Sequence, residues 1–321
     1  MIRPRVGKAN NGQIMSLELV NGMIARTEYA ADLLRQYKLV AGNAMYVEPY
    51  YDGTRVSYLQ PVAGGATPTQ PISSAYRIVG QATISGTIKA YIYSGTTFTT
   101  FSVPGDTGGT AAYGVDGSNI VGVAFVGGIN IGFLYDGSTF TILSVPGSTL
   151  TRAFDIDGSN IVGYTTIGGV NKGFLYNGST FTTFSVPGST LTIAQGIDGS
   201  NIVGYATIGG INKGFIYDGS IFTTFSVPGS NNTVAYKIDG SNIVGFATIG
   251  AINKGFIYDG LTFTTFSVPD SQSTAAFGIN GLNIVGNTGI DGTTKGFIYD
   301  GSSFTIFTVP DAGLTSAFGI G

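Results

Sequence analysis

Carboxylates that recur at a fixed spacing are the side chains of this sequence best suited to chemistry. Paired carboxylates can carry out acid–base catalysis or bind Ca²⁺. One set is Asp116, Asp157, Asp198 and Asp239, with Asn280 next; the other is Asp136, Asp218, Asp259 and Asp300, with Ser94 and Asn177 at equivalent positions. Every one of these residues precedes a glycine, and Asn or Ser replaces the acid in some copies. Turn formation is the preferred interpretation, so we predict no catalytic residue and no metal site.

A second repeated set is cationic. Its members are Lys89, Lys172, Lys213, Lys254 and Lys295, and the amides Asn171, Asn212 and Asn253 precede three of them. On a closed ring they would form a circle of charge and amides able to bind an acidic or hydroxyl-rich glycan at several weak sites at once. The favoured alternative is a solvated rim that discourages strand pairing between molecules.

Aromatic pairs and single glycines also recur. The pairs are Phe133/Tyr135, Phe174/Tyr176, Phe215/Tyr217, Phe256/Tyr258 and Phe297/Tyr299; the glycines are Gly122, Gly163, Gly204, Gly245 and Gly286. Stacking on a sugar or base is one interpretation of the aromatic pairs. Packing inside a sheet protein is favoured, because central strands are buried on both faces. The glycines predict close approach of two backbones.

The composition excludes several classes of protein. The 321 residues include 51 glycines and no cysteine, histidine or tryptophan, and 43% are hydrophobic. The absence of cysteine excludes disulfides, thiol nucleophiles and cysteine-based zinc sites. The absence of histidine removes the usual general base and the commonest transition-metal ligand. A net charge of −3 offers no basic surface to nucleic acid. We expect a folded protein that is not an enzyme and needs no cofactor.

These residues belong to a repeat that fills positions 75–321. The tripeptide Ile-Val-Gly begins at Ile78, Ile120, Ile161, Ile202, Ile243 and Ile284, so six copies follow one another at steps of 41 or 42 residues. One copy contains four short runs of Phe, Tyr, Ile, Val and Thr separated by Asp-Gly turns, for example 235–238, 243–247, 255–258 and 263–268. Four antiparallel strands per repeat predict a six-bladed β-propeller.

The two ends of the repeat region predict a closed ring. The first copy lacks the hairpin that precedes Ile-Val-Gly in the other five, and the chain ends on the matching segment, 317–321. A last strand that completes the first blade would remove two exposed sheet edges. An open β-helix would need polar caps instead.

A different segment precedes the repeats. Residues 1–61 predict a helix over 16–39 and a hairpin with an Asp-Gly turn at 52–53, and residues 62–74 form a Pro/Gly/Thr-rich linker. The helix carries a heptad seam of Val20, Met23, Thr27, Ala30, Leu34 and Tyr37. Because one helix and one hairpin cannot bury a core alone, we expect an anchor that self-associates, for example as a trimer, or docks on a larger body. Packing of the helix on the propeller is the alternative.

The start of the chain carries no apolar signal core, and no run of 18 apolar residues occurs anywhere. The expectation is synthesis in a cytoplasm without a signal peptide and no insertion into a membrane.

Two resemblances extend this reading. Segment 196–204 followed by 214–219 resembles the bacterial HAF extracellular repeat, although that family's His-Ala-Phe step reads Asn-Lys-Gly-Phe here. This resemblance implies a propeller-like extracellular module without established chemistry. Segments 20–24 and 28–34 resemble the anchors of tailed-phage head-fibre and decoration proteins.

Together the two resemblances imply a virion structural protein that is anchored to other virion proteins through residues 1–61 and displays its propeller towards host-surface glycans. A cellular, lectin-like propeller at the cell surface or outside the cell is the alternative.

Overall fold

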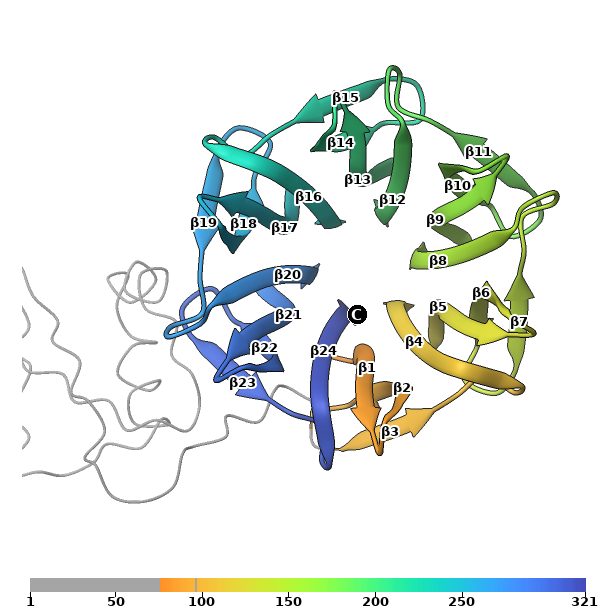
Figure 1. Ribbon diagram of the computed structural model, residues 1–321, viewed down its shortest axis with the longest axis horizontal. Coiled ribbons are helices and arrows are strands. Elements are labelled where there is room, and N and C mark those ends of the chain that lie inside the picture. Colours follow the sequence, from red (N-terminus) through yellow and green to blue (C-terminus); the bar gives the residue numbers. More distant parts are fainter. Residues whose placement is uncertain (1–75, 96) are drawn as a thin grey trace, which may run out of the picture. The chain divides into compact units, whose positions relative to one another are not determined.

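The computed structural model describes residues 76–95 and 97–321, and all regular structure in this part of the chain is β (Figure 1). Its 24 strands form six separate four-stranded sheets, which are arranged radially about one central axis. The predicted six-bladed propeller is therefore confirmed. The predicted helix, hairpin, linker and assembly residues Val20, Met23, Thr27, Ala30, Leu34 and Tyr37 lie outside the described residues.

Each blade has an innermost, a second, a third and an outer strand, and its sheet follows that order. The innermost strands are β4 (Asp106–Asp116), β8 (Leu150–Asp157), β12 (Leu191–Asp198), β16 (Ser230–Asp239), β20 (Ser273–Asn280) and β24 (Ala312–Ile320). The second strands are β1 (Ile78–Ile84), β5 (Asn119–Val126), β9 (Asn160–Ile167), β13 (Asn201–Ile208), β17 (Asn242–Ile249) and β21 (Asn283–Ile290). The third strands are β2 (Thr87–Tyr93), β6 (Ile129–Tyr135), β10 (Val170–Tyr176), β14 (Ile211–Tyr217), β18 (Ile252–Tyr258) and β22 (Thr293–Tyr299). The outer strands are β3 (Phe98–Phe101), β7 (Phe140–Leu143), β11 (Phe181–Phe184), β15 (Phe222–Phe225), β19 (Phe263–Phe266) and β23 (Phe304–Phe307). We number blades 1 to 6 from the blade that contains β1.

The ring closes as predicted, because the last strand completes the first blade. Strand β24 pairs antiparallel with β1, and Ile320 lies opposite Ile78. Beyond the ladder, Arg77 and Gly321 exchange two backbone hydrogen bonds of 2.8 and 3.0 Å. Blade 1 therefore contains both ends of the repeat region (Figure 1). This closure leaves neither β1 nor β24 as an unpaired edge.

The innermost strands begin earlier than the sequence predicts, and each contains a buried threonine with a structural role. In blade 5 the strand starts at Ser230 rather than at Ala235, and the Thr233 hydroxyl accepts a hydrogen bond of 3.0 Å from the Val227 N–H. The equivalent threonines of the other blades are Thr110, Thr151, Thr192, Thr274 and Thr315, and each accepts the same bond from a Val N–H. This valine lies two residues beyond the end of the outer strand, so its buried N–H has no ladder partner and bonds to the hydroxyl instead.

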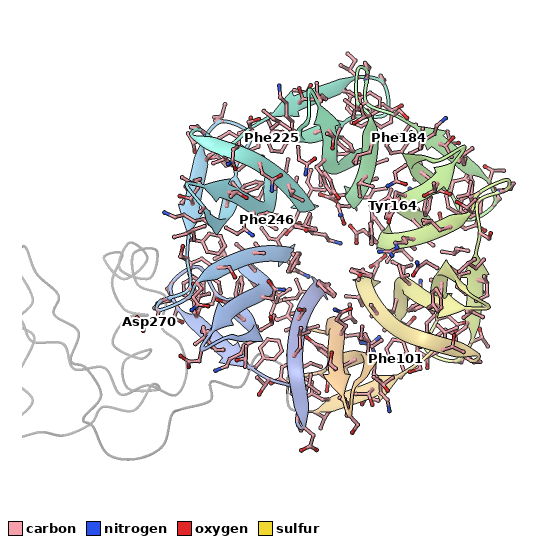
Figure 2. The ribbon with its side chains drawn as sticks, in the orientation of Figure 1. Phe101, Tyr164, Phe184, Phe225, Phe246 and Asp270 are labelled. Carbon is pink, nitrogen blue, oxygen red and sulfur yellow. The ribbon has the colours of Figure 1, made fainter. Side chains whose placement is uncertain are left out.

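The hydrophobic core lies between neighbouring blades. Between blades 3 and 4, Val162 and Val186 pack against Ile202 and Phe215, all of them buried. At the same junction, Phe184 of the outer strand, labelled in Figure 2, stacks on Tyr217 with ring centroids 5.5 Å apart. The predicted packing role of the repeated aromatic pairs is thus confirmed.

The repeated glycine on each second strand permits close approach of the innermost strand. A Cβ on Gly204 would lie 2.0 Å from the carbonyl oxygen of Ile193, a distance that no pair of atoms tolerates. The same clash, at 1.9–2.1 Å, would occur at Gly122, Gly163, Gly245 and Gly286. The predicted close approach is confirmed.

Candidate functional site

The repeated lysines lie on the third strand of separate blades. Lys172 is opposite Thr165 of β9, and Lys213 and Lys254 occupy the same register in blades 4 and 5. Successive residues of a strand point to opposite faces, so Asn171 and Lys172 face different neighbouring blades. A glycan-binding role of this rim stays a prediction.

The asparagines of this rim are engaged inside their own blades. The Oδ1 atom of Asn171 accepts a hydrogen bond of 2.7 Å from the Thr166 hydroxyl. Asn212 and Asn253 accept equivalent bonds from Thr207 and Thr248. These contacts join the second and third strands, which gives the three amides a structural task.

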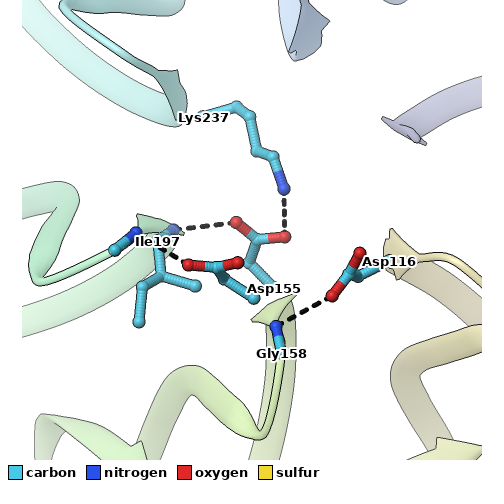
Figure 3. Close-up of polar contacts among 7 residues, drawn as sticks. Asp116, Asp155, Gly158, Ile197 and Lys237 are labelled. Carbon is cyan, nitrogen blue, oxygen red and sulfur yellow. Dashed lines mark hydrogen bonds and ion pairs between the residues drawn. The ribbon is translucent and has the colours of Figure 1, made fainter.

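The first set of repeated aspartates connects neighbouring blades. The Asp116 carboxylate accepts a hydrogen bond of 2.8 Å from the N–H of Gly158 in the next blade (Figure 3). The same bond runs from Gly199 to Asp157, from Gly240 to Asp198 and from Gly281 to Asp239. These acids therefore sit in Asp-Gly turns, as predicted, and each turn is tied to the turn that follows it around the ring.

The second set of aspartates stabilises the turn between the third and outer strands. Asp136 accepts hydrogen bonds from the N–H groups of Ser138 and Thr139, both 2.8 Å long. The Thr139 N–H is the largest of the contacts that lower the pKa of Asp136 well below its usual value, because they favour the charged carboxylate. Asn177 makes the same backbone contacts in blade 3. The predicted turn role is confirmed.

Side chains from different blades come together at the central axis. A cavity of about 400 Å³, which we call the central cavity, is lined by residues from all six innermost strands. One position per blade contributes to it: Tyr113, Phe154, Gln195, Tyr236, Phe277 and Phe318. In each innermost strand this residue is the extra one of a β-bulge, and a bulge re-aims its side chain.

Five of these six side chains are aromatic, and we call the six together the collar. Tyr113 contacts Phe154 at 5.0 Å and Phe318 at 4.7 Å between ring centroids. The contacts continue from Phe318 to Phe277 at 5.1 Å and from Phe277 to Tyr236 at 4.5 Å. Gln195 fills the remaining place, so a single amide interrupts a ring of aromatic side chains.

The polar lining of the central cavity comes from neutral groups and one ion pair. Gln81, Asn287 and Ser316 supply amides and a hydroxyl, and the Asn287 amide donates to the Ser316 hydroxyl at 3.1 Å. Lys237 and Asp155 also line the cavity and pair with each other, and Asp155 is 1% exposed (Figure 3). These two residues come from blades 5 and 3, and Asp155 also accepts a bond of 2.8 Å from the Ile197 N–H of blade 4. Three blades therefore meet at this carboxylate.

Burial raises the pKa of Asp155, while the Lys237 ammonium and the Ile197 N–H oppose that shift. Glycine occupies the equivalent position in the other four blades, as Gly114, Gly196, Gly278 and Gly319. A Cβ at Gly114 would lie 2.7 Å from the Cα of Asp155, which shows how tightly the innermost strands approach one another.

Sequence reasoning missed the collar and the ion pair, although a signal was present. Most positions keep the same residue in at least four of the six copies, whereas the collar position and the position two residues before it do not, and the position after the collar departs from glycine in two copies. Divergence within an otherwise uniform repeat marks the place where the ring departs from its symmetry. Recognising which varying position faces the axis required the bulges.

Within residues 76–95 and 97–321, no three acidic side chains are grouped so that they could hold a metal ion. No helix in the described part of the chain is long and apolar enough to span a bilayer. The central cavity combines aromatic faces with amides, hydroxyls and the Lys237–Asp155 ion pair.

Comparison with known proteins identifies the fold. No protein-family model and no curated protein matches the sequence. Among solved structures, TolB from Acinetobacter baumannii is similar, at 17% identity and a TM-score of 0.59 over 75% of this chain and 64% of that chain. This chain thus spans less than two thirds of that protein's length.

The fungal lectin of Aleuria aurantia, a six-bladed propeller, aligns at 16% identity and a TM-score of 0.50 over 74% of this chain and 92% of the lectin. A chain of a nidogen–laminin complex aligns at 11% identity and a TM-score of 0.50, over 77% of this chain and 97% of that one. The resemblances to HAF repeats and phage anchors gain no support from these comparisons and stay predictions. At these identities the comparisons show that residues 76–321 have the fold of a six-bladed β-propeller.

Proposed function

We propose that this protein is a non-enzymatic binding protein whose propeller takes a saccharide in the central cavity. The observation that carries the proposal is the lining of that cavity, in which aromatic faces and neutral amides converge from all six blades. Sugars present apolar C–H faces together with hydroxyls that both donate and accept hydrogen bonds, so they suit such a lining. Its volume of about 400 Å³ lies within the range of small-molecule sites.

Two further features support binding rather than catalysis. The repeated carboxylates are engaged in turns and in contacts between blades, and Asp155 is held by Lys237. The Aleuria aurantia lectin, of the same fold, is described by its fucose recognition. Because a fold alone supplies no site, that likeness shows only that this architecture is compatible with a saccharide ligand.

The test is a calorimetric titration of the full chain with saccharides chosen from a glycan array. One ligand per chain is expected, because only one axis exists. The variant Gln195→Phe carries an aromatic residue at this position, as the other five blades do. Its affinity for the saccharide should be about fivefold lower than that of the unmodified chain, as expected for the loss of one neutral hydrogen bond of ~1 kcal/mol from the Gln195 amide.

The repeated lysines are tested alongside. A variant with Lys89, Lys172, Lys213, Lys254 and Lys295 replaced by Gln should keep the stoichiometry and affinity of the unmodified chain. Several ligands per chain, lost in this variant and retained by Gln195→Phe, would assign saccharide binding to the rim and overturn the central cavity as the site.

We further propose that the propeller is displayed on a phage virion and anchored by residues 1–61, where the heptad seam supports self-association. Particles purified from the native source should contain the chain, and deletion of residues 1–61 should abolish its incorporation. If the chain is absent from particles and is found on or outside cells, the lectin-like alternative holds instead.

A further inference from the structure

A second cavity adjoins the central one and contains an arginine that breaks the repeat. The second cavity, of about 370 Å³, is lined by residues of blades 1, 2 and 3, and it shares Gln81 and Tyr113 with the central cavity. Arg152 of β8 lines it. The equivalent positions hold Ala111, Ile193, Val234, Ala275 and Ser316. The fold therefore does not need a cation at this position.

The Arg152 guanidinium lies among aromatic side chains and has no acidic partner. Its central carbon lies 5.8 Å from the centroid of the Tyr164 ring. Its Nε atom is buried and hydrogen-bonded to nothing. Among residues 76–95 and 97–321 the one ion pair is Lys237–Asp155, so no carboxylate in this part of the chain neutralises Arg152. A partly buried charge without a partner is unfavourable, and a bound anion would offset that cost.

The second cavity also contains an asparagine, Asn130, whose usual hydrogen-bond partner is absent from this copy of the repeat. Asn130 occupies the position of Asn171, Asn212 and Asn253, whose amides bond to a threonine on the adjacent strand. Opposite Asn130 this threonine is replaced by Phe125, which has no hydroxyl. The Asn130 amide makes no hydrogen bond within the described residues and lines the same cavity as Arg152.

The carboxylate closest in the chain to this cavity is already saturated. Asp106 accepts hydrogen bonds from the N–H groups of Gly108, Gly109 and Phe125, at 3.2, 2.9 and 3.2 Å, and from the Thr110 hydroxyl at 2.9 Å. It is not among the residues that line the cavity. The lining is therefore cationic and neutral, without an acid.

We propose that the second cavity binds the carboxylate of an acidic saccharide, held by the Arg152 guanidinium and the Asn130 amide. A planar guanidinium donates two parallel N–H bonds to a carboxylate, and these charge-assisted bonds are stronger than its bonds to the hydroxyls of a neutral sugar. The sugar ring extends past Tyr113 and Gln81 into the central cavity, because these two residues line both. This inference rests on the proposed function and names the chemical class of its ligand.

The test compares matched sugars on the full chain by calorimetry. The pairs are methyl glucuronide with methyl glucoside, methyl galacturonide with methyl galactoside, and N-acetylneuraminic acid with its methyl ester. In at least one pair the acid should bind about tenfold or more tightly, the difference expected for a charge-assisted hydrogen bond.

Arg152→Ala introduces the residue found at this position in blades 2 and 6 and should fold normally. It should bind both members of the pair with affinities within about twofold. Lys213→Ile, which likewise removes one positive charge and introduces the blade 2 residue, is the control and should keep the preference for the acid.

The outcomes separate the two proposals. Equal binding of acid and neutral sugar by the unmodified chain would overturn the carboxylate site and leave the saccharide site in place. If none of the pairs binds while a saccharide chosen from the glycan array does, the carboxylate site is overturned and the saccharide site remains; if no saccharide of either kind binds, both proposals are overturned. Tighter binding of galactose 6-sulfate than of methyl galacturonide, lost in Arg152→Ala, would replace the carboxylate by a sulfate and overturn the proposal as stated.

Discussion

Some positions of the repeat hold a different residue in only one or two blades. Such a residue has a role at its own place in the ring that the other blades do not share. Asp155 and Lys237 occupy a position that is glycine in the other four blades, yet they are paired across the intervening blade. Glycine at both positions is therefore compatible with the backbone. Removing one partner, in contrast, leaves the other charge buried.

This contrast gives a prediction for a double-mutant cycle. Asp155→Gly leaves the Lys237 ammonium, in a side chain that is 12% exposed, without its carboxylate, and Lys237→Gly does the converse. Each should lower the free energy of unfolding by about 3 kcal/mol. The double variant should lose much less than the sum, because it restores the arrangement of the other blades. Urea denaturation measures the cycle; additive losses would show that the two residues are not coupled.

The turn aspartates predict how stability changes with pH. Hydrogen bonds from the N–H groups of Thr139, Ile221 and Thr262 are the largest causes that lower the pKa values of Asp136, Asp218 and Asp259 below 3.8. The unfolded chain then binds more protons than the folded one near pH 3–4, so this stabilisation is present above the unfolded pKa. It is lost as the pH falls through the folded pKa, over about pH 5 to 2.

Replacing these three aspartates by Asn, the residue found at position 177, keeps the turn bonds and removes the titration. The free energy of unfolding of this triple variant should therefore vary less between pH 5 and 2 than that of the unmodified chain. Chemical denaturation at each pH measures this difference. Parallel pH curves for the two proteins would contradict the assignment.

Between elements, the glycine at the centre of each second strand sets the distance to the innermost strand. Gly204→Ala would place a Cβ 2.0 Å from the Ile193 carbonyl oxygen, and two buried strands cannot separate without breaking their ladder. We expect a loss of at least ~3 kcal/mol in unfolding free energy, as for strong overpacking. Gly313→Ala is the control, because a Cβ there meets no atom within 4 Å. Equal thermal stability of the two variants would refute the close approach.

For the whole molecule, closure of the ring depends on the pairing of β24 with β1. A chain that ends at Asp311 would leave β1 as an exposed edge in blade 1 and remove Ala317 and Ile320 from the core. We expect this variant to aggregate or to lose cooperative unfolding, as seen by size-exclusion chromatography and thermal denaturation.

A circular permutant provides the control for that truncation. Residues 312–320 can be joined to Ile78 through Asp-Gly-Ser-Asn, the turn that connects innermost and second strands in blades 2 to 5. This chain regains the β24–β1 pair as an ordinary hairpin and should unfold cooperatively as a monomer. A permutant that aggregates like the truncated chain would show that more than this strand pair holds the ring closed.

Much of this architecture could be predicted from the amino-acid sequence alone. The 41-residue period, the Asp-Gly turns and the β-branched runs are local features, and they determined the number of blades and the strands of each. The first copy lacks the strand that precedes Ile-Val-Gly in the other copies, and the segment 317–321 matches that missing strand. This complementarity predicted the closure of the ring. Where a residue had only a local task, as Asp136 has in its turn, the prediction was confirmed.

Only the tertiary structure decided which residues face the axis. The collar is directed inwards by bulges in the ladder between the innermost and the second strand of each blade, where the register shifts, and no local sequence pattern marks these bulges. Asp155 meets Lys237 across 82 residues of sequence, and the cavity beside Arg152 is lined by residues of three blades. Such contacts join residues of different blades, so they depend on how the blades pack around the axis. The sequence of a single repeat does not determine this long-range arrangement.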